Sequence, residues 1–215
     1  MSMITNPRTG ATLAFLSAAL LAPHVADARA QTESTQMHEE DRVARTTVEG
    51  QGARLEVAFD PDGDALAVRY RISNTGREPL AVFDRGDRHA VLTKKLVAGE
   101  VGPPRFVELD DGLVLSHEAR PLPDPAPTVP PVPLAARLDA GQAMDGAFAF
   151  DLSLAGRGAR VRWCLGVAAF DADRFETSES AGDVPVWTAP FDIVDTQQRL
   201  CTPWFDVSSR TFEAD

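Results

Sequence analysis

The sequence predicts an all-β fold, built as an antiparallel β-sandwich with one proline-rich crossover on its surface. From Val43 onward, apolar residues recur at every second position in short segments. Glycine, proline, asparagine and aspartate separate these segments, and no stretch carries a long apolar stripe with the period of a helix. Alternation with a period of two between turn residues is typical of half-buried strands, so the pattern favours many short strands in two packed sheets.

The first thirty residues have the pattern of a secretory signal peptide. Arg8 supplies a positive start, Ala11–Ala22 is an apolar run, and Ala28-Arg29-Ala30 provides the small-x-small site that signal peptidase cleaves. The twelve residues of that run would span about 18 Å as a helix, short of the ~30 Å hydrocarbon core. We therefore expect a periplasmic or secreted protein with no membrane span after cleavage. The alternative is an uncleaved anchor or a buried helix.

Composition divides the remaining chain into three parts. Residues 31–42 are polar without an apolar period, which predicts a flexible leader. The strand-like alternation runs from 43 to 207, which is enough chain for one β-sandwich domain with its own core. Residues 208–215 are expected to form a C-terminal tail.

The clearest hairpin is expected at residues 53–73. Its first strand alternates apolar residues with polar or small ones, and Pro61-Asp62-Gly63 then supplies a turn, because proline presets φ and glycine accepts a positive φ. A slip of one residue would expose the whole apolar set, so the register is strongly specified. The second strand has one apolar face, made of Leu66, Val68, Tyr70 and Ile72.

Shorter alternations predict the remaining strands, on both sides of a proline-rich segment. Residues 121–133 contain seven of the chain's sixteen prolines, and proline cannot donate to a strand ladder. We expect this segment to cross the surface in a polyproline II conformation, the alternative being a linker between two domains. The other predicted strands lie at 80–83, 90–97, 105–109, 112–117, 132–138, 147–154, 160–167, 186–194 and 198–207.

Three passages combine alternating apolar residues with turn residues in the same way. They are VRYRISNTGREPLAVF at 68–83, LDAGQAMDGAFAFDL at 138–152 and VRWCLGVAAF at 161–170. These passages resemble strands of bacterial exported immunoglobulin-like domains, the proteinase-inhibitor-like BsuPI domains among them. The resemblance implies an immunoglobulin-like arrangement of the two sheets. Its motifs are common to many sandwiches, so it carries no functional residue over to this chain.

The charge balance excludes one class of partner. Lysine and arginine number 21 against 32 aspartate and glutamate, a formal net charge of −11. Binding of nucleic acid needs clustered cations that replace the counterions of the phosphates. We therefore expect no nucleic-acid partner.

Cys164 and Cys201 are the only two cysteines of the chain. An exported chain with two cysteines usually joins them, and both lie in predicted strands near the C-terminus. We therefore expect a structural disulfide. Free thiols or a redox pair are the alternatives, although the C-x-x-C spacing of a thioredoxin-like catalyst is absent.

Asp84, Asp87 and His89 are weak candidates for a metal site. They stand close together in the segment FDRGDRH and would offer three ligands on one loop. Carboxylates and imidazoles are common ligands of divalent metals. The alternative is a solvated turn around Gly86, and we expect neither a metal nor another cofactor.

Four arginines form the main candidate binding site. Arg69 and Arg71 share the polar face of one predicted strand, and Arg160 and Arg162 share that of another. If the two strands were neighbours, the guanidinium groups would form a ladder that is unfavourable without anions. Guanidinium binds carboxylate bidentately, so such a ladder predicts a site for an acidic partner or ligand. The alternative is neutralisation by acids within the sheet, such as Glu56.

The sequence carries no catalytic signature. It has no G-x-S-x-G elbow, and Ser116 and His117 are strand neighbours whose side chains point to opposite faces. We expect an exported, non-catalytic sandwich with a binding or accessory role in the cell envelope, toward an unknown protein or envelope ligand. The alternatives are a proteinase-inhibitor-type module that presents one loop, and an envelope enzyme with a carboxylate or metal site.

Overall fold

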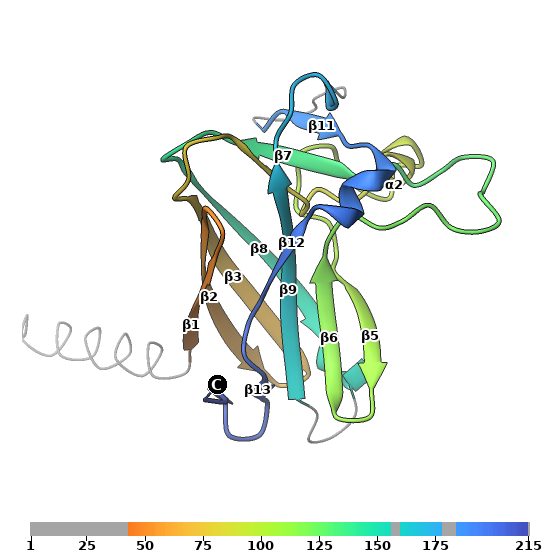
Figure 1. Ribbon diagram of the computed structural model, residues 1–215. Helices are drawn as coiled ribbons and strands as arrows, with labels where there is room; N and C mark the ends of the chain where they lie inside the picture. Colours follow the sequence, from red (N-terminus) through yellow and green to blue (C-terminus); the bar gives the residue numbers. More distant parts are fainter. Residues whose placement is uncertain (1–42, 156–159, 178–183, 215) are drawn as a thin grey trace, which may run out of the picture. The chain divides into compact units, whose positions relative to one another are not determined.

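The computed structural model describes residues 43–155, 160–177 and 184–214. These residues form mostly β-strands, arranged as two sheets that pack against each other (Figure 1). The expected all-β sandwich is confirmed. The expected signal peptide at 1–30 and the leader at 31–42 lie outside the described residues.

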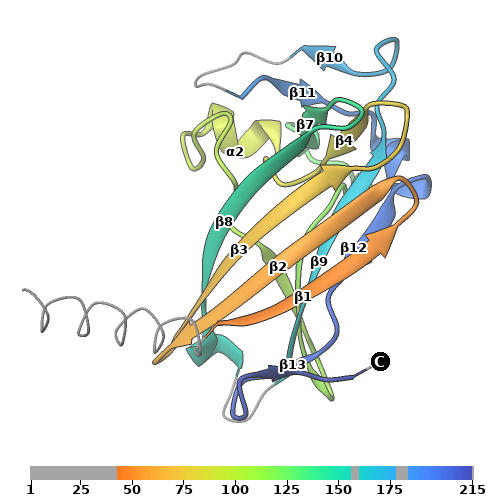
Figure 2. The ribbon, with the colours of Figure 1, turned by 90° about the vertical axis from the view of Figure 1, so that its left-hand side faces the viewer.

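The first sheet has four antiparallel strands in the order β1-β2-β3-β8, which lie side by side in Figure 2. The alternation seen in the sequence sets which face is buried. Leu55, Val57 and Phe59 of β2 are at most 3% exposed, whereas the residues between them face outward. The strands are β1 (Ala44–Gly50), β2 (Ala53–Asp62), β3 (Ala65–Asn74) and β8 (Ala143–Asp151).

The turn between β2 and β3 lies later than expected. The sequence pattern places it at residues 61–63, whereas β2 continues through Asp62 and the turn is formed by Gly63, with φ of 58°, and Asp64. Asp62 and Ala65 close the hairpin, so the ring nitrogen of Pro61 points away from β3. On that side the pairing with β1 has already ended, so no main-chain donor is needed there.

The second sheet is built around β9. Strands β4, β6, β12 and β13 all pair with β9, and β6 runs parallel to it, which departs from the expected wholly antiparallel arrangement. β5 adds to β6, and β7, β11 and β10 continue the sheet beyond β4. The strands are β4 (Leu80–Val82), β5 (Arg105–Leu109), β6 (Gly112–His117), β7 (Leu134–Leu138), β9 (Arg160–Ala169), β10 (Glu176–Thr177), β11 (Val186–Thr188), β12 (Gln198–Cys201), β13 (Phe205–Asp206) and β14 (Thr211–Phe212). Two 3₁₀ turns are η1 (Leu152–Ala155) and η2 (Phe191–Asp195).

The main core lies between the two sheets. Trp163 of β9 is fully buried, and its ring centroid lies 4.8 Å from that of Tyr70 on β3. Tyr70 lies directly over Gly146 of β8, where any Cβ atom would collide with the tyrosine ring. A glycine in this strand therefore lets an aromatic side chain cross over the backbone. A second, smaller apolar cluster contains Phe170 and Phe175.

A disulfide joins Cys164 and Cys201, as the sequence predicts. The two residues stand directly opposite each other on β9 and β12. The bond links positions 37 residues apart and closes the C-terminal part of the chain onto the central strand.

Further local expectations are wrong. The strand expected at 186–194 ends at Thr188, and Phe191–Asp195 form η2. Residues 90–97, expected as a strand, instead begin with the last part of the short helix α2 (Arg88–Leu92), whose first turn is capped by the Asp87 side chain, which accepts from the Ala90 N–H at 2.9 Å. The expected tail at 208–215 also contributes to the domain. Its residues Thr211 and Phe212 form β14, which pairs with β13, and Phe212 packs against the main core.

The proline-rich segment 121–133 connects β6 and β7, two strands of the same sheet. This is the crossover that the sequence predicts, and the described strands after it join the same two sheets. Residues 121–129 are exposed throughout and form the long green loop in Figure 1. Among the described residues, no helix combines the length and the apolar character needed to cross a membrane.

Candidate functional site

The four candidate arginines lie in two different sheets. Arg69 and Arg71 belong to β3 of the first sheet, and Arg160 and Arg162 belong to β9 of the second. β3 pairs with β2 and β8, so the expected neighbourhood of the two arginine strands is wrong. The four guanidinium groups therefore do not form one ladder.

The arginines of the first sheet have acidic partners next to them. Arg69 Nη2 lies 3.4 Å from a carboxylate oxygen of Asp60 on the neighbouring strand. Arg71 Nη1 lies 2.8 and 2.9 Å from the two carboxylate oxygens of Asp145 on β8. Both pairs are exposed and contribute at most about 1 kcal/mol to stability. They nevertheless neutralise this face of the sheet.

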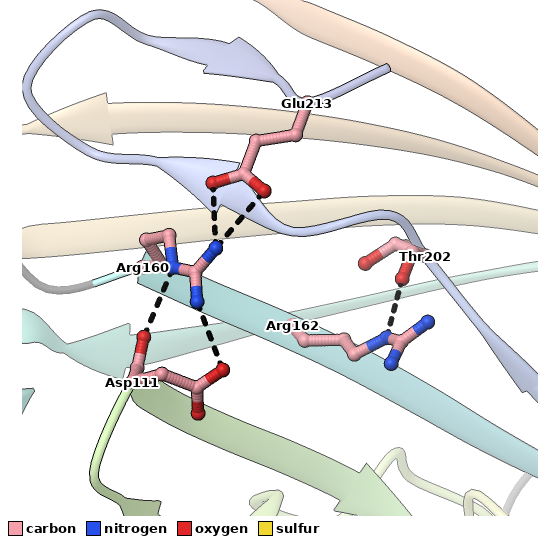
Figure 3. A network of polar contacts seen from close by, with 5 residues as sticks. All are labelled: Asp111, Arg160, Arg162, Thr202 and Glu213. Atoms are coloured by element: carbon pink, nitrogen blue, oxygen red, sulfur yellow. Dashed lines mark hydrogen bonds and ion pairs between the residues drawn. The ribbon is translucent and has the colours of Figure 1, made fainter. Parts of the chain in front are cut away.

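The arginines of the second sheet form a network with the C-terminal segment (Figure 3). Arg160 donates to both carboxylate oxygens of Glu213 at 3.1 Å, and to the main-chain and side-chain oxygens of Asp111 at 3.0 and 2.9 Å. Arg162 Nε donates to the Thr202 carbonyl at 2.8 Å. These side chains therefore connect β9 to the end of the chain and to the β5–β6 turn.

The three candidate metal ligands point to separate places. Asp84 is fully buried and accepts from the Tyr70 hydroxyl. Asp87 caps α2 through the Ala90 N–H, and His89 lies within that helix. In the part of the chain that the structure describes, no three His, Cys, Asp or Glu side chains lie close enough together to hold a metal ion.

Asp84 and Arg85, which the sequence places in a solvated turn, are buried, with 0% and 5% exposure. Arg85 Nε lies 3.0 Å from Asp84 Oδ1, a close electrostatic contact without an aligned hydrogen bond. The Tyr70 hydroxyl donates to the other carboxylate oxygen at 2.5 Å. Burial raises the pKa of the Asp84 carboxyl, against the opposing effects of the guanidinium and of Tyr70. Burial, together with the nearby Asp84, also raises the pKa of the Tyr70 hydroxyl, which stays a donor.

His117 is a further buried titratable group of this region. Trp163 Nε1 donates to its Nδ1 at 3.0 Å, and its Nε2 lies 2.8 Å from the Gly102 carbonyl. An indole nitrogen can only donate, so the proton of the neutral ring sits on Nε2 and goes to the carbonyl. Burial lowers the pKa of the His117 imidazole, which stays neutral with both nitrogens engaged.

The buried polar groups fasten the loop 93–104 to the core. Arg85 Nη1 donates to the Gly99 carbonyl at 2.8 Å, and the Gly102 N–H donates to the Asp84 carbonyl at 2.9 Å. A buried ion pair is costly unless its remaining donors and acceptors are satisfied. Here the Gly99 carbonyl of the loop satisfies one donor of Arg85, and a separate main-chain hydrogen bond joins Gly102 to Asp84, so these two residues hold the loop in position.

A pocket of about 680 Å³ lies between this loop, the end of β6 and the proline-rich crossover. Prolines from both ends of the crossover, together with Leu96 and Leu122, supply its apolar lining. Ser116 and His117 at the end of β6 line it as well. Mostly apolar walls with a few polar groups are typical of ligand sites.

The crossover is tied down at both ends, which gives the pocket a fixed wall. The Gln197 side chain donates to the Ala119 carbonyl at 2.8 Å and accepts from the Ala119 N–H at 3.1 Å. At the other end the Arg88 N–H donates to the Val132 carbonyl at 2.9 Å. Only the part between these anchors, residues 121–129, is exposed along its whole length.

Three cationic side chains line the pocket: Lys95, Arg105 and Arg120. Of its carboxylates, Asp87 lies 3.9 Å from Arg105, and Glu118 is held 2.7 Å from Arg199. Asp124 is the third carboxylate of the lining and belongs to the exposed part of the crossover. Among the residues described, no carboxylate lies within ion-pair distance of the other two cations. The lining thus carries equal numbers of cations and carboxylates, but Lys95 and Arg120 stay available to a ligand.

Sequence reasoning missed this pocket and its cations. The pocket combines three segments of the chain, at residues 83–105, 116–124 and 131–133. No local motif marks any of them as a site. The one available signal was the density of prolines, which indicated a crossover but not what it covers.

Comparison with known proteins assigns no function to this geometry. No family model matches the chain, and no curated protein or solved structure matches it significantly. The function is therefore inferred from the residues of the chain itself.

Proposed function

We propose that this chain is an exported, non-catalytic binding protein of the cell envelope, with its ligand site in the pocket beneath the crossover. The observation that carries this proposal is one pocket of about 680 Å³ in which apolar walls meet two cations, Lys95 and Arg120, that have no carboxylate at ion-pair distance among the described residues. Ligand sites commonly have volumes of about 300–1,000 Å³ and few, well-placed polar groups. Such a lining favours a ligand that is partly apolar and carries an anionic group.

The state of the polar side chains supports binding over catalysis. His117 is the one imidazole in the pocket lining, and both of its nitrogens already hold hydrogen bonds. A general base needs a free nitrogen within reach of the proton that it removes. His117 therefore offers Ser116 no activation as a nucleophile, and its role is to support the pocket wall.

The rigidity of the walls also supports a binding role. The loop 93–104 is fixed by the buried Asp84 and Arg85, and the crossover is fixed at Ala119 and Val132. A site that is already in its bound form costs less entropy on binding. These two anchored walls would keep the pocket open in the free protein.

Export is proposed from the signal-like residues 1–30 and from the disulfide, since disulfides form and persist mainly outside the cytosol. N-terminal sequencing of the protein purified from the periplasm or the medium is expected to begin at Gln31. Recovery from the cytoplasm with residue 1 intact would contradict this part of the proposal.

The pocket itself is tested with Leu122→Asp, which places a carboxylate in the lining beside the cations. Leu122 is 40% exposed, so the substitution leaves the core untouched. The matched control is Leu154→Asp, since Leu154 is 52% exposed and does not line the pocket. The wild-type chain and both variants serve as bait for affinity capture from envelope extract.

We expect the captured ligand to bind Leu122→Asp at least about tenfold more weakly, because an unfavourable carboxylate contact costs about 1.4 kcal/mol or more. The control Leu154→Asp should bind like the wild type. Equal retention by all three proteins would mean that the pocket is not the ligand site.

A further inference from the structure

β5 is an unpaired edge of the second sheet. Among the residues that the structure describes it pairs only with β6, beside which it lies in Figure 1. All five of its residues are exposed. Phe106, Val107 and Leu109 are 47%, 57% and 46% exposed. Unpaired main-chain groups beside exposed apolar side chains are a template for another strand.

The hairpin register shows which main-chain groups of β5 are free. The turn Asp110-Asp111 is closed by Leu109 and Gly112, which stand opposite each other. The pair that closes such a turn is hydrogen-bonded, and bonded and non-bonded pairs then alternate along the ladder. The N–H and C=O groups of Phe106 and Glu108 therefore point outward, to the free edge.

The free edge leads into the pocket. Pro103, Pro104 and Arg105 at the start of β5 line it. A strand added antiparallel to β5 would have its carboxyl end at this side, whereas a parallel strand would have its amino end there. The lining also holds three carboxylates, of which Asp87 and Glu118 lie within ion-pair distance of Arg105 and Arg199. Lys95 and Arg120 remain to attract a carboxylate and repel an ammonium group, against Asp124 of the exposed crossover, so the charge favours the antiparallel direction.

We propose that the partner is the carboxyl-terminal tail of a polypeptide, which adds to β5 as an antiparallel strand and places its terminal carboxylate among the pocket cations. This inference rests on the proposed binding function of the pocket and names the class of its partner. The main-chain groups of Phe106 and Glu108 hold the tail, and apolar side chains at alternate positions of the tail contact the exposed face of β5. Strand addition and terminal-carboxylate capture are both recurring modes of peptide recognition.

The test uses two pools of fluorescein-labelled decapeptides with random sequences, one with free carboxyl termini and one with carboxamide termini. Both pools are passed over the immobilised full domain with its disulfide intact. We expect the protein to retain peptides only from the carboxylate pool. The best of them are then synthesised singly, and their dissociation constants are measured by fluorescence anisotropy.

Two sets of variants separate the edge from the pocket. Glu108→Pro removes an outward-facing N–H without touching the ladder to β6, whereas Glu108→Ala keeps it. The combined Lys95→Gln and Arg120→Gln variant removes two cations, and Arg45→Gln on β1 is its matched control on the first sheet. N-methylation of the peptide at alternate positions gives the same edge test without changing the protein.

We expect Glu108→Pro and the N-methylated peptides to abolish binding, and the loss of the two cations to weaken it at least about tenfold, since a hydrogen bond to a charged group contributes about 1.5–3 kcal/mol. Both control variants should bind like the wild type. Failure to retain either pool, equal retention of the carboxamide pool, or unchanged binding by Glu108→Pro would overturn the inference.

Two further results would identify another occupant of the edge and overturn the inference. One is a concentration-dependent dimer in sedimentation velocity that Glu108→Pro abolishes, which would assign the edge to a second copy of the chain. The other is a captured envelope ligand that is sensitive to Leu122→Asp but not to Glu108→Pro. In that case the proposed binding function of the pocket would be supported, and the proposal that a peptide tail adds to β5 would be rejected. If the wild type and Leu122→Asp captured the same ligand equally well, the proposed function of the pocket would itself be rejected.

Discussion

His117 shows how a single residue can connect the core to the candidate site. Its ring accepts from the indole of Trp163 in the core and donates to the Gly102 carbonyl in the pocket wall. Protonation would place an N–H on Nδ1, facing the indole N–H at 3.0 Å. The folded protein therefore favours the neutral ring, in agreement with the lowering of the pKa of His117 by burial.

This arrangement predicts a pH dependence of stability. In the unfolded chain His117 takes up a proton near its ordinary pKa of 6.5. In the folded chain the pKa of His117 is lower, so protonation needs a lower pH. The contribution of His117 to the free energy of unfolding should therefore be at its full value above about pH 6.5 and fall as the pH decreases below that value. Urea unfolding between about pH 5 and pH 7.5 measures it.

The control for this pH dependence is His117→Gln, whose side-chain oxygen can still accept from Trp163. The variant should show a smaller loss of stability on acidification, because its side chain does not titrate. Asp84 is present in both proteins, so the raised pKa of its carboxyl contributes to both curves. Identical slopes in the wild type and the variant would contradict the assignment of a neutral, buried His117.

At the scale of the elements, the disulfide between β9 and β12 is the strongest single constraint. It joins positions 37 residues apart, and a loop of that length gives about 4 kcal/mol in the chain-entropy model. Replacing Cys164 with Ala and Cys201 with Ser should therefore lower the free energy of unfolding by about 2–4 kcal/mol. Urea unfolding under oxidising conditions measures the difference.

A reducing agent supplies the control for the disulfide prediction. With the thiols reduced before unfolding, the wild type and the double variant should have nearly the same stability, because neither then carries the cross-link. A double variant as stable as the oxidised wild type would mean that the bond does not constrain the unfolded chain.

The elements that the sequence predicts well are those whose pattern is local. The β2–β3 hairpin and the β5–β6 hairpin follow from alternation over neighbouring residues, and both are present. The predicted strand at 90–97 is wrong because a helix cap at Asp87 outweighs the short apolar alternation. That cap is a local signal too, and weighing it would have found α2.

Whether the four arginines form a ladder, and where the pocket lies, depend on contacts between distant parts of the chain, which no local sequence pattern encodes. The ladder required β3 and β9 to be neighbours, and only the packing of the whole chain places them in different sheets. The burial of Asp84 and Arg85 depends on Tyr70 from the first sheet and on the loop around Gly99. Charged residues beside a glycine are typical of a solvated turn, so the sequence alone points to the surface.

On the scale of the whole molecule, the net charge of −11 opposes the approach of an anionic ligand. The Debye length at physiological ionic strength is about 8 Å, so acidic residues farther than that from the pocket are largely screened from a ligand there. The cations of the pocket act at contact distance, where screening is weak. For the proposed ligand, the unpaired cations of the lining therefore matter more than the net charge, which mainly keeps copies of the chain apart.

The domain boundary is also a property of the whole chain, because its last residues complete the core. The Phe212 ring lies 5.0 Å from that of Phe59 and 5.2 Å from that of Phe205, and Glu213 pairs with Arg160. The Glu213 N–H also donates to the Trp204 carbonyl at 2.7 Å. These contacts make residues 211–213 part of the folding unit.

A chain that ends at Val207 should therefore be less stable than the full chain by about 2–4 kcal/mol. Most of this comes from the apolar burial of Phe212, about 1.5–3 kcal/mol, because a partly exposed ion pair adds at most about 1 kcal/mol. Urea unfolding of the two chains measures the loss, and a chain that ends at Glu213 is the control that should match the full length. Equal stability of all three chains would show that the domain ends at Val207 and that β14 only rests on its surface.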